Sequence, residues 1–61
     1  MTKQEFDNYK FGVKTRIVYF EDRQGEVVDV VKEVHFGERW VGIERGQIIR
    51  YHEIKKIFEE I

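Results

Sequence analysis

The chain contains neither leucine nor alanine, although fifteen of its 61 residues are valine or isoleucine. Leucine and alanine are the apolar residues that favour helices most, whereas the branched Cβ of valine and isoleucine fits a pleated sheet. Any core must therefore be built from stiff β-branched side chains together with five Phe, three Tyr and one Trp. The composition predicts a mainly β fold.

Length and charge limit the protein further. A chain of 61 residues is expected to form a single small domain, residues 1–61. It has no cysteine, which excludes disulfides and thiolate metal sites, and no apolar stretch long enough for a membrane span. The formal net charge of −1 creates no overall attraction to nucleic acid or to anionic lipid. We therefore expect a cytoplasmic protein with no membrane partner.

Alternating patterns predict four strands. The first covers residues 11–19, with Phe11 and Tyr19 on the same face, and a turn at residues 22–25 follows, closed by a Gly25 with positive φ. The second covers residues 26–36, and its phase is broken near Val31, as a bulge or a strong bend would break it. Two shorter strands are expected over residues 39–44 and 47–51.

Both ends of the chain have helical patterns. Thr2 and Glu5 have the spacing of a capping box, which predicts a helical turn over residues 3–8, with a frayed terminus as the alternative. Near the other end, a helical stripe predicts a short helix within residues 53–61. The alternative there is a 3₁₀ turn at residues 52–54 followed by a closing strand at 55–58. The stripe consists of Ile54, Ile57, Phe58 and Ile61.

The order of strands and glycine turns resembles that of small SH3-like and Sm-like barrels. The residues that carry the resemblance are Gly25, the long run 26–36 and the closing stretch 47–57, in which Arg50 stands where such families often have proline. The resemblance implies a four- to five-stranded antiparallel barrel or strongly bent sheet. Residues 1–9 would form a turn or tail, 10–52 the sheet and 53–61 the closing element. The Asp- and Asn-containing RNA-binding loops of Sm-like proteins are not matched.

Catalytic and metal-binding patterns are not found. The chain has no serine or cysteine nucleophile, and its isolated glycines form no phosphate-binding loop. His35 and His52 are the only histidines, and neither has a second ligand at metal spacing. We therefore expect a non-enzymatic protein with no cofactor, no metal and no small-molecule substrate.

A mixed basic and aromatic surface is one functional candidate. If Ile17 and Tyr19 face the core, basic and aromatic residues of the first strand lie on its opposite face, and the later strands could extend this surface. Such a surface could bind single-stranded RNA by base stacking and phosphate contacts. The simpler interpretation is that Phe20 and Trp40 belong to the core. The candidate surface residues are Lys14, Arg16, Phe20, Arg39, Trp40 and Arg50.

Sheet edges are the second and favoured candidate. The edge strands of small barrels can pair with another protein or with a second copy of the same chain. The valine-rich segment from Val27 to Val31 is the expected adhesive segment, and Asp29 would limit its aggregation. The near-neutral charge favours a protein partner or a homo-oligomer over nucleic acid. We therefore expect a small interaction module, with RNA binding as the alternative.

Overall fold

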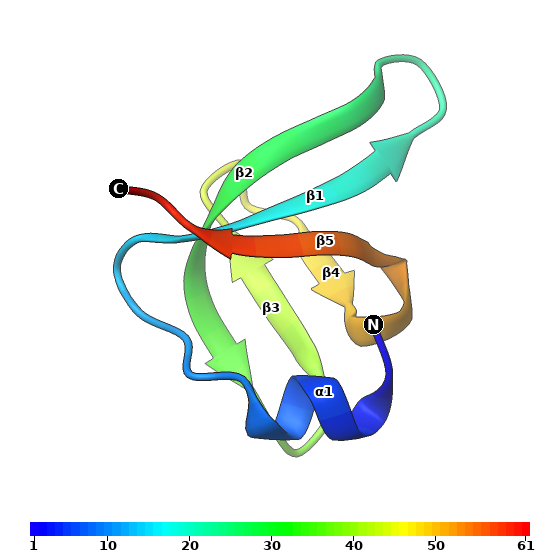
Figure 1. Ribbon diagram of the computed structural model, residues 1–61. Helices are drawn as coiled ribbons and strands as arrows, with labels where there is room; N and C mark the ends of the chain where they lie inside the picture. The colour runs from blue at the N-terminus through cyan, green and yellow to red at the C-terminus, as the bar shows by residue number, and fades with distance from the viewer.

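The alternating segments form one antiparallel sheet with the strand order β4-β3-β2-β1-β5 (Figure 1). The computed structural model describes all residues, 1–61. Strands β4 and β5 are not hydrogen-bonded to each other, so the sheet is bent but not closed. The elements are α1 Lys3–Asn8, β1 Thr15–Glu21, β2 Gly25–His35, β3 Trp40–Ile43, β4 Ile48–Arg50, the 3₁₀ helix η1 Tyr51–Glu53 and β5 Ile54–Glu59.

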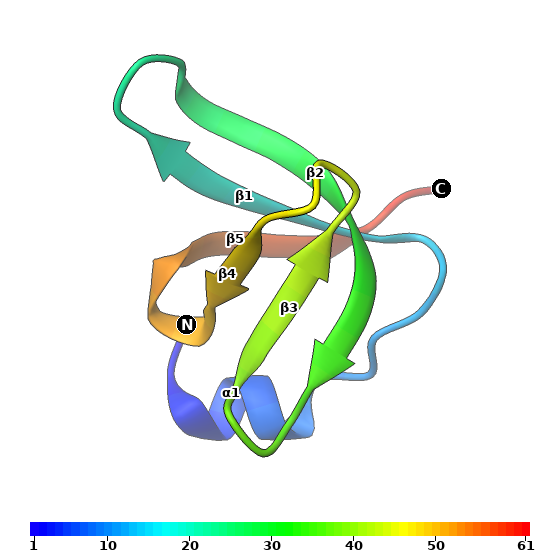
Figure 2. The same ribbon diagram turned by 180° about the vertical axis from the view of Figure 1, so that it is seen from behind.

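The long strand β2 belongs to both halves of the sheet. Its first half pairs with β1 and its second half with β3, so the strand curves from one hairpin into the other (Figure 2). The register with β3 shifts by one residue at Lys32. The predicted break in phase is therefore confirmed as a bulge, and it allows Val31 and Val34, three residues apart, to face the same side.

The predicted C-terminal helix is wrong, and the alternative of a 3₁₀ turn and a closing strand is confirmed with bounds 51–53 and 54–59. Ile57 faces Ile17 and Ile54 faces Tyr19 across β1. Between these pairs β5 contains one extra residue, which is a bulge at Lys55. The bulge places isoleucines three positions apart on one face, and the resulting sequence pattern is indistinguishable from that of a helix.

Strand β1 begins four residues later than expected. The Thr15 hydroxyl accepts a hydrogen bond from the Gly12 amide at 2.8 Å, and the Thr15 amide donates to the Gly12 carbonyl at 3.1 Å. This turn directs residues 11–14 away from β2, and Val13 is 89% exposed. The alternating pattern of Phe11, Val13 and Thr15 therefore belongs to a loop and a turn before the strand.

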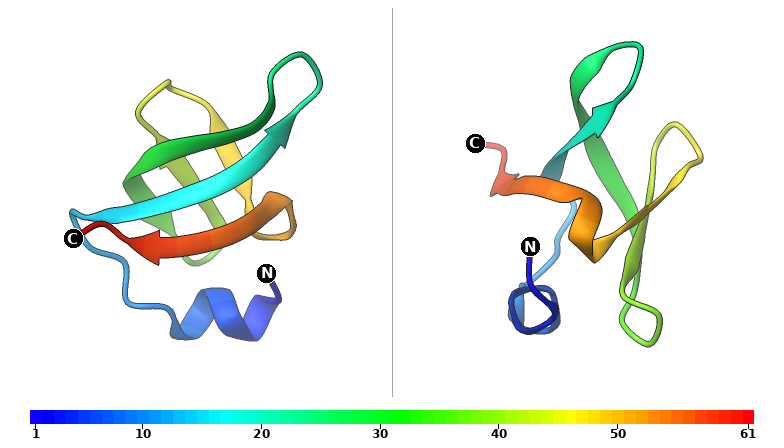
Figure 3. Two further views of the ribbon diagram at one scale, coloured as in Figure 1. Left: turned by 45° about the horizontal axis from the view of Figure 1, so that its top comes forward. Right: turned by 90° about the vertical axis from the view of Figure 1, so that its right-hand side faces the viewer.

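Helix α1 lies beside β5 at the open side of the sheet (Figure 3). The predicted capping box is confirmed: the Thr2 hydroxyl accepts from the Glu5 amide at 3.1 Å, and the Thr2 amide donates to the Glu5 carboxylate at 2.7 Å. Phe6 is fully buried and anchors the helix in the core. With six residues, this helix cannot cross a membrane, and the chain has no other α-helix. The core residues are Phe6, Ile17, Tyr19, Val27, Val31, Val41, Ile43, Ile49 and Ile54.

Candidate functional site

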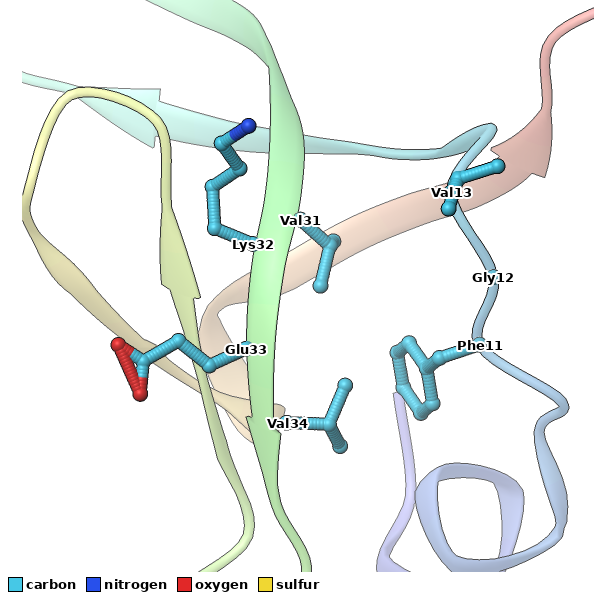
Figure 4. Close-up of a pocket in the computed structure, with 7 residues that line it drawn as sticks. All are labelled: Phe11, Gly12, Val13, Val31, Lys32, Glu33 and Val34. Carbon is cyan, nitrogen blue, oxygen red and sulfur yellow. The ribbon is translucent and has the colours of Figure 1, made fainter.

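A groove lies where β1 ends and β2 continues. The pairing of β1 with β2 reaches only to Arg16 and Val30, whereas β2 runs on to His35 beside β3. The edge of β2 that faces away from β3 therefore has no neighbouring strand over residues 31–35. A hollow of about 250 Å³ opens along this edge (Figure 4), lined by Phe11, Gly12, Val13, Val31, Lys32, Glu33 and Val34.

Apolar side chains from two segments face each other across the groove. Val31 and Val34 project from β2 toward Phe11, while the side chains of Lys32 and Glu33 leave the strand on its other side (Figure 4). No backbone hydrogen bond joins residues 9–14 to residues 31–35. The groove thus combines an apolar lining with a strand edge that has no backbone partner, and these are the two features that strand addition requires.

The loop that forms the far wall is fixed at several points. The ring of Phe11 packs against Phe6 and Phe36, with centroid distances of 5.3 and 5.9 Å. Beyond it, the Lys14 carbonyl accepts a hydrogen bond from the Glu60 amide at 2.9 Å. Because aromatic packing and backbone bonding hold the loop on both sides of residues 12 and 13, the groove is already formed without a ligand.

Tyr9 and Glu59 hold the start of the same loop. The Tyr9 hydroxyl donates to Oε2 of Glu59 at 2.6 Å, and the Thr15 hydroxyl donates to the same oxygen at 2.7 Å. Burial, together with the hydrogen bond and the charge of Glu59, raises the pKa of Tyr9 to about 12. The hydrogen bonds from Tyr9 and Thr15 lower the pKa of Glu59. Both pKa shifts therefore favour a neutral tyrosine and a charged carboxylate, which are the protonation states that form this hydrogen bond.

Positive charge is available at the loop. Lys10 and Lys14 flank the groove-forming residues, are exposed, and take part in no ion pair. On β2, by contrast, Lys32 lies 3.9 Å from Glu44, and Glu33 lies 2.8 Å from Nε2 of His35. The loop side of the groove therefore offers two lysines to a ligand, whereas on the β2 side Lys32 has Glu44 as a counter-charge and Glu33 is hydrogen-bonded to His35.

The first-strand residues of the predicted basic and aromatic surface lie on or near the outer face of β1. Phe20 is 56% exposed, and the Lys55 ammonium lies 5.5 Å from the centre of its ring. The Arg16 guanidinium is 2.7 Å from the Glu60 carboxylate. Lys14 belongs to the loop before the strand. The expectation that Phe20 is a core residue is wrong, because the inward positions of β1 are those of Ile17 and Tyr19.

The other three residues of that surface lie in the second half of the sheet. Trp40 on β3 is half-buried and stacks on His35, with centroids 3.7 Å apart, so the expectation that it lies in the core is also wrong. Arg50 faces it from β4. Arg39 is held by Asp7, which accepts from Nε at 3.0 Å and from Nη2 at 2.8 Å. The six residues are thus divided between the two halves of the bent sheet.

The predicted adhesive segment is not an edge over residues 27–30, and only its last residue, Val31, reaches the free edge. Val27, Asp29 and Val31 point inward and are buried, and the backbone of residues 25–30 is paired with β1. Oδ1 of Asp29 accepts from the Val30 amide at 2.6 Å, and Oδ2 lies 3.5 Å from Nε of Arg45. The aspartate therefore connects β2 to the turn after β3. The free part of β2 begins where this segment ends.

A second, smaller hollow of about 200 Å³ lies between α1 and the outer edge of β5. The N-terminal amine donates to the Ile54 carbonyl there at 3.1 Å, so one backbone acceptor of this edge is occupied. The other lining residues are Glu5, Lys55, Lys56 and Ile57. Compared with the first groove, this hollow is shielded by the helix and contains fewer apolar side chains.

No family model, curated protein or solved structure matches the chain. The groove is therefore the feature from which a function can be inferred, and the sequence pattern did not predict it. The expected strand over residues 11–19 would have covered the β2 edge completely. The one signal for the groove is the spacing of Gly12 and Thr15, since a threonine hydroxyl three residues after a glycine can cap a turn.

Proposed function

We propose that this protein is a non-enzymatic interaction module that binds an extended peptide segment of a partner protein. The peptide adds a strand to β2 along residues 31–35, inside the groove between β2 and the loop at residues 11–14. The observation that supports this proposal is the end of the β1 pairing at Val30, which leaves an unpaired strand edge beside an apolar hollow.

The groove also indicates the chemistry of the peptide. Alternate side chains of an added strand would point toward Val31, Val34 and Phe11, which favours β-branched or aromatic residues at those positions. Acidic residues beside the apolar ones would meet the free ammonium groups of Lys10 and Lys14. The expected ligand is an extended segment that alternates apolar and polar residues and carries a net negative charge.

The fold supports a finer structural assignment as part of the same proposal. We propose that the chain is an SH3-like or Sm-like small barrel that is left open between β4 and β5. The strand order, the bent β2 and the 3₁₀ turn before β5 support this assignment. A peptide that pairs with the free edge of β2 would add one strand to a sheet that is already formed.

RNA binding is the alternative function, and one observation favours it. Trp40 is stacked on His35 and lies opposite Arg50, so an aromatic plane and a cation are close together on the outer face of β3 and β4. An oligonucleotide pool that binds at low salt, with a salt dependence that Arg50→Ala reduces, would support this alternative. The side chains of these three residues do not line the proposed peptide groove.

The peptide proposal can be tested with a synthetic peptide in which valine alternates with threonine and glutamate, so that the peptide carries a net negative charge. In a titration followed by amide NMR, we expect shifts concentrated at residues 11–14 and 31–35, and slower hydrogen exchange at the Val34 amide. A peptide of the same sequence with alternate backbone nitrogens methylated should not bind, because it lacks the amide donors for strand pairing. Equal binding of both peptides, or no binding of either, contradicts the proposal.

A matched pair of variants tests the position of the site. Val13→Glu places a carboxylate on the loop wall of the groove, whereas Ile48→Glu places one on β4; both side chains are largely exposed. We expect Val13→Glu to weaken peptide binding by about tenfold, because of repulsion from the acidic peptide and lost apolar contact, and Ile48→Glu to have no effect. Equal effects of the two substitutions would place the peptide elsewhere.

A further inference from the structure

The outer face of the half-sheet formed by β2, β1 and β5 carries a set of apolar side chains that point away from the core. β1 lies between the other two strands (Figure 3). Phe20 and Val28 are 56% exposed and Phe58 is 42% exposed. Val18 lies at the centre, opposite Val28 on β2 and Lys56 on β5. We call this surface the outer β face; its apolar residues are Val18, Phe20, Val28, Val30 and Phe58.

Val18 shows that this surface is continuous. It is only 8% exposed, although it does not belong to the core cluster and alternates with the inward-facing Ile17 and Tyr19. The neighbouring outward side chains therefore cover it from outside. An apolar surface of this kind on a chain of 61 residues is typical of a protein interface rather than of a solvated sheet face.

The two sides of the outer β face carry opposite charges. The β2 side carries Glu26, whereas the β5 side carries Lys55 and Lys56. Lys55 reaches across Phe20 to Glu26, with Nζ 3.3 Å from Oε2. Lys56 is exposed and has no ion pair within the chain. The face is thus acidic on one side of β1, basic on the other side and apolar between them.

This arrangement is complementary to itself. We propose that the outer β face packs against the same face of a second copy, with a twofold axis running along β1. Such an axis places the β2 side of one chain over the β5 side of the other, so Glu26 lies toward Lys55 of the second copy and Val28 lies over its Lys56. It also places Val30 over Phe58 and Phe20 over Phe20. Arg16, which lies near the axis, already has Glu60 as its counter-charge.

The dimer interface and the peptide groove are different surfaces with different partners, a second copy of the chain and an extended peptide. Residues 31–35 of β2 and the loop at 11–14 do not belong to the outer β face. A dimer formed in this way would leave both grooves accessible and would present two of them to a partner. Two linked sites increase the apparent affinity for a partner that contains the bound segment twice.

Sedimentation equilibrium over a range of concentrations tests the dimer. We expect the wild-type chain to dimerise, and Val28→Lys to raise the dissociation constant by about a hundredfold, since each introduced ammonium group would face Lys56 of the second copy. Ile48→Lys is the matched control, because Ile48 is 55% exposed but lies on β4. A wild-type chain that stays monomeric at millimolar concentration, or equal effects of the two substitutions, would overturn the proposal.

A charge exchange tests the orientation independently of Val28. The double variant Lys55→Glu, Lys56→Glu is acidic on both sides of β1, and Glu26→Lys is basic on both sides. We expect each variant alone to be mainly monomeric and an equimolar mixture of the two to form a heterodimer. Circular dichroism establishes that each variant is folded. Homodimers of either variant as stable as those of the wild type, or a mixture that does not associate, would exclude the twofold arrangement.

Discussion

The Tyr9 hydroxyl donates a hydrogen bond of 2.6 Å to the Glu59 carboxylate, which connects the segment after α1 to the end of β5, fifty positions along the chain. The Thr15 hydroxyl donates to the same carboxylate oxygen. Three segments that are separate in the sequence therefore meet at one acceptor, next to the loop that forms the proposed peptide groove.

At alkaline pH, Tyr9 should reduce stability as it loses its proton. Its pKa is about 12 in the folded protein, against an ordinary value of 10, so between these values the folded chain keeps a proton that the unfolded chain has lost. The contribution of Tyr9 to the free energy of unfolding is complete below pH 10 and disappears as the pH rises through about 12. Urea unfolding should show a smaller fall in stability with pH in this window for Tyr9→Phe than for wild type. Parallel curves would contradict the assignment.

At acidic pH, Glu59 acts in the opposite direction. Its pKa is lowered in the folded state by the hydrogen bonds from Tyr9 and Thr15, so the folded chain loses the proton more readily than the unfolded chain. Its contribution to stability is present above the ordinary glutamate pKa and is lost as the pH falls through the lowered value. Glu59→Gln should reduce the dependence of stability on pH below neutrality. Glu38→Gln, on the exposed turn between β2 and β3, is the control and should leave the wild-type profile.

The ion pair of Asp29 and Arg45 should stabilise the junction between the two hairpins. Asp29 is 8% exposed, and its Oδ2 has no hydrogen bond and only Arg45 nearby as a counter-charge. Arg45→Ala leaves this buried carboxylate without a counter-charge and should cost about 1 to 3 kcal/mol in the free energy of unfolding. Denaturant unfolding measures the loss, and Arg23→Ala, a substitution in the exposed turn between β1 and β2, is the control. If both variants lose the same stability, the ion pair has no specific role.

The bulge at Lys55 accommodates one extra residue between the two inward isoleucines of β5, so removal of that residue should be tolerated. Deletion of Lys55 leaves Ile54 and Ile57 two positions apart, and strict alternation then still places both on the core face. We therefore expect the deletion to cost much less than Ile54→Ala. That substitution empties an almost fully buried core position and should cost about 2 to 4 kcal/mol in the free energy of unfolding. A deletion variant as unstable as Ile54→Ala in denaturant unfolding would show that the bulge itself is required.

The sequence predicted the features that depend on neighbouring residues. The capping box of Thr2 and Glu5, the positive φ of Gly25 and the break in phase near Val31 are all present. Each depends on a local requirement, such as an unpaired helix amide or a turn that only a residue without Cβ adopts easily. Such requirements are the same in any fold that contains the segment.

The tertiary structure decided how these segments are used, because burial depends on partners that are distant in the sequence. Residues 11–14 alternate like a strand, but packing of Phe11 on Phe6 and Phe36 removes them from the sheet and leaves part of β2 unpaired. Ile54 and Ile57 repeat like a helix, but pairing with β1 through a bulge makes them a strand. The absence of leucine and alanine thus determined the β architecture from the sequence alone. The open edge and the outward apolar face became visible only when the sheet was assembled.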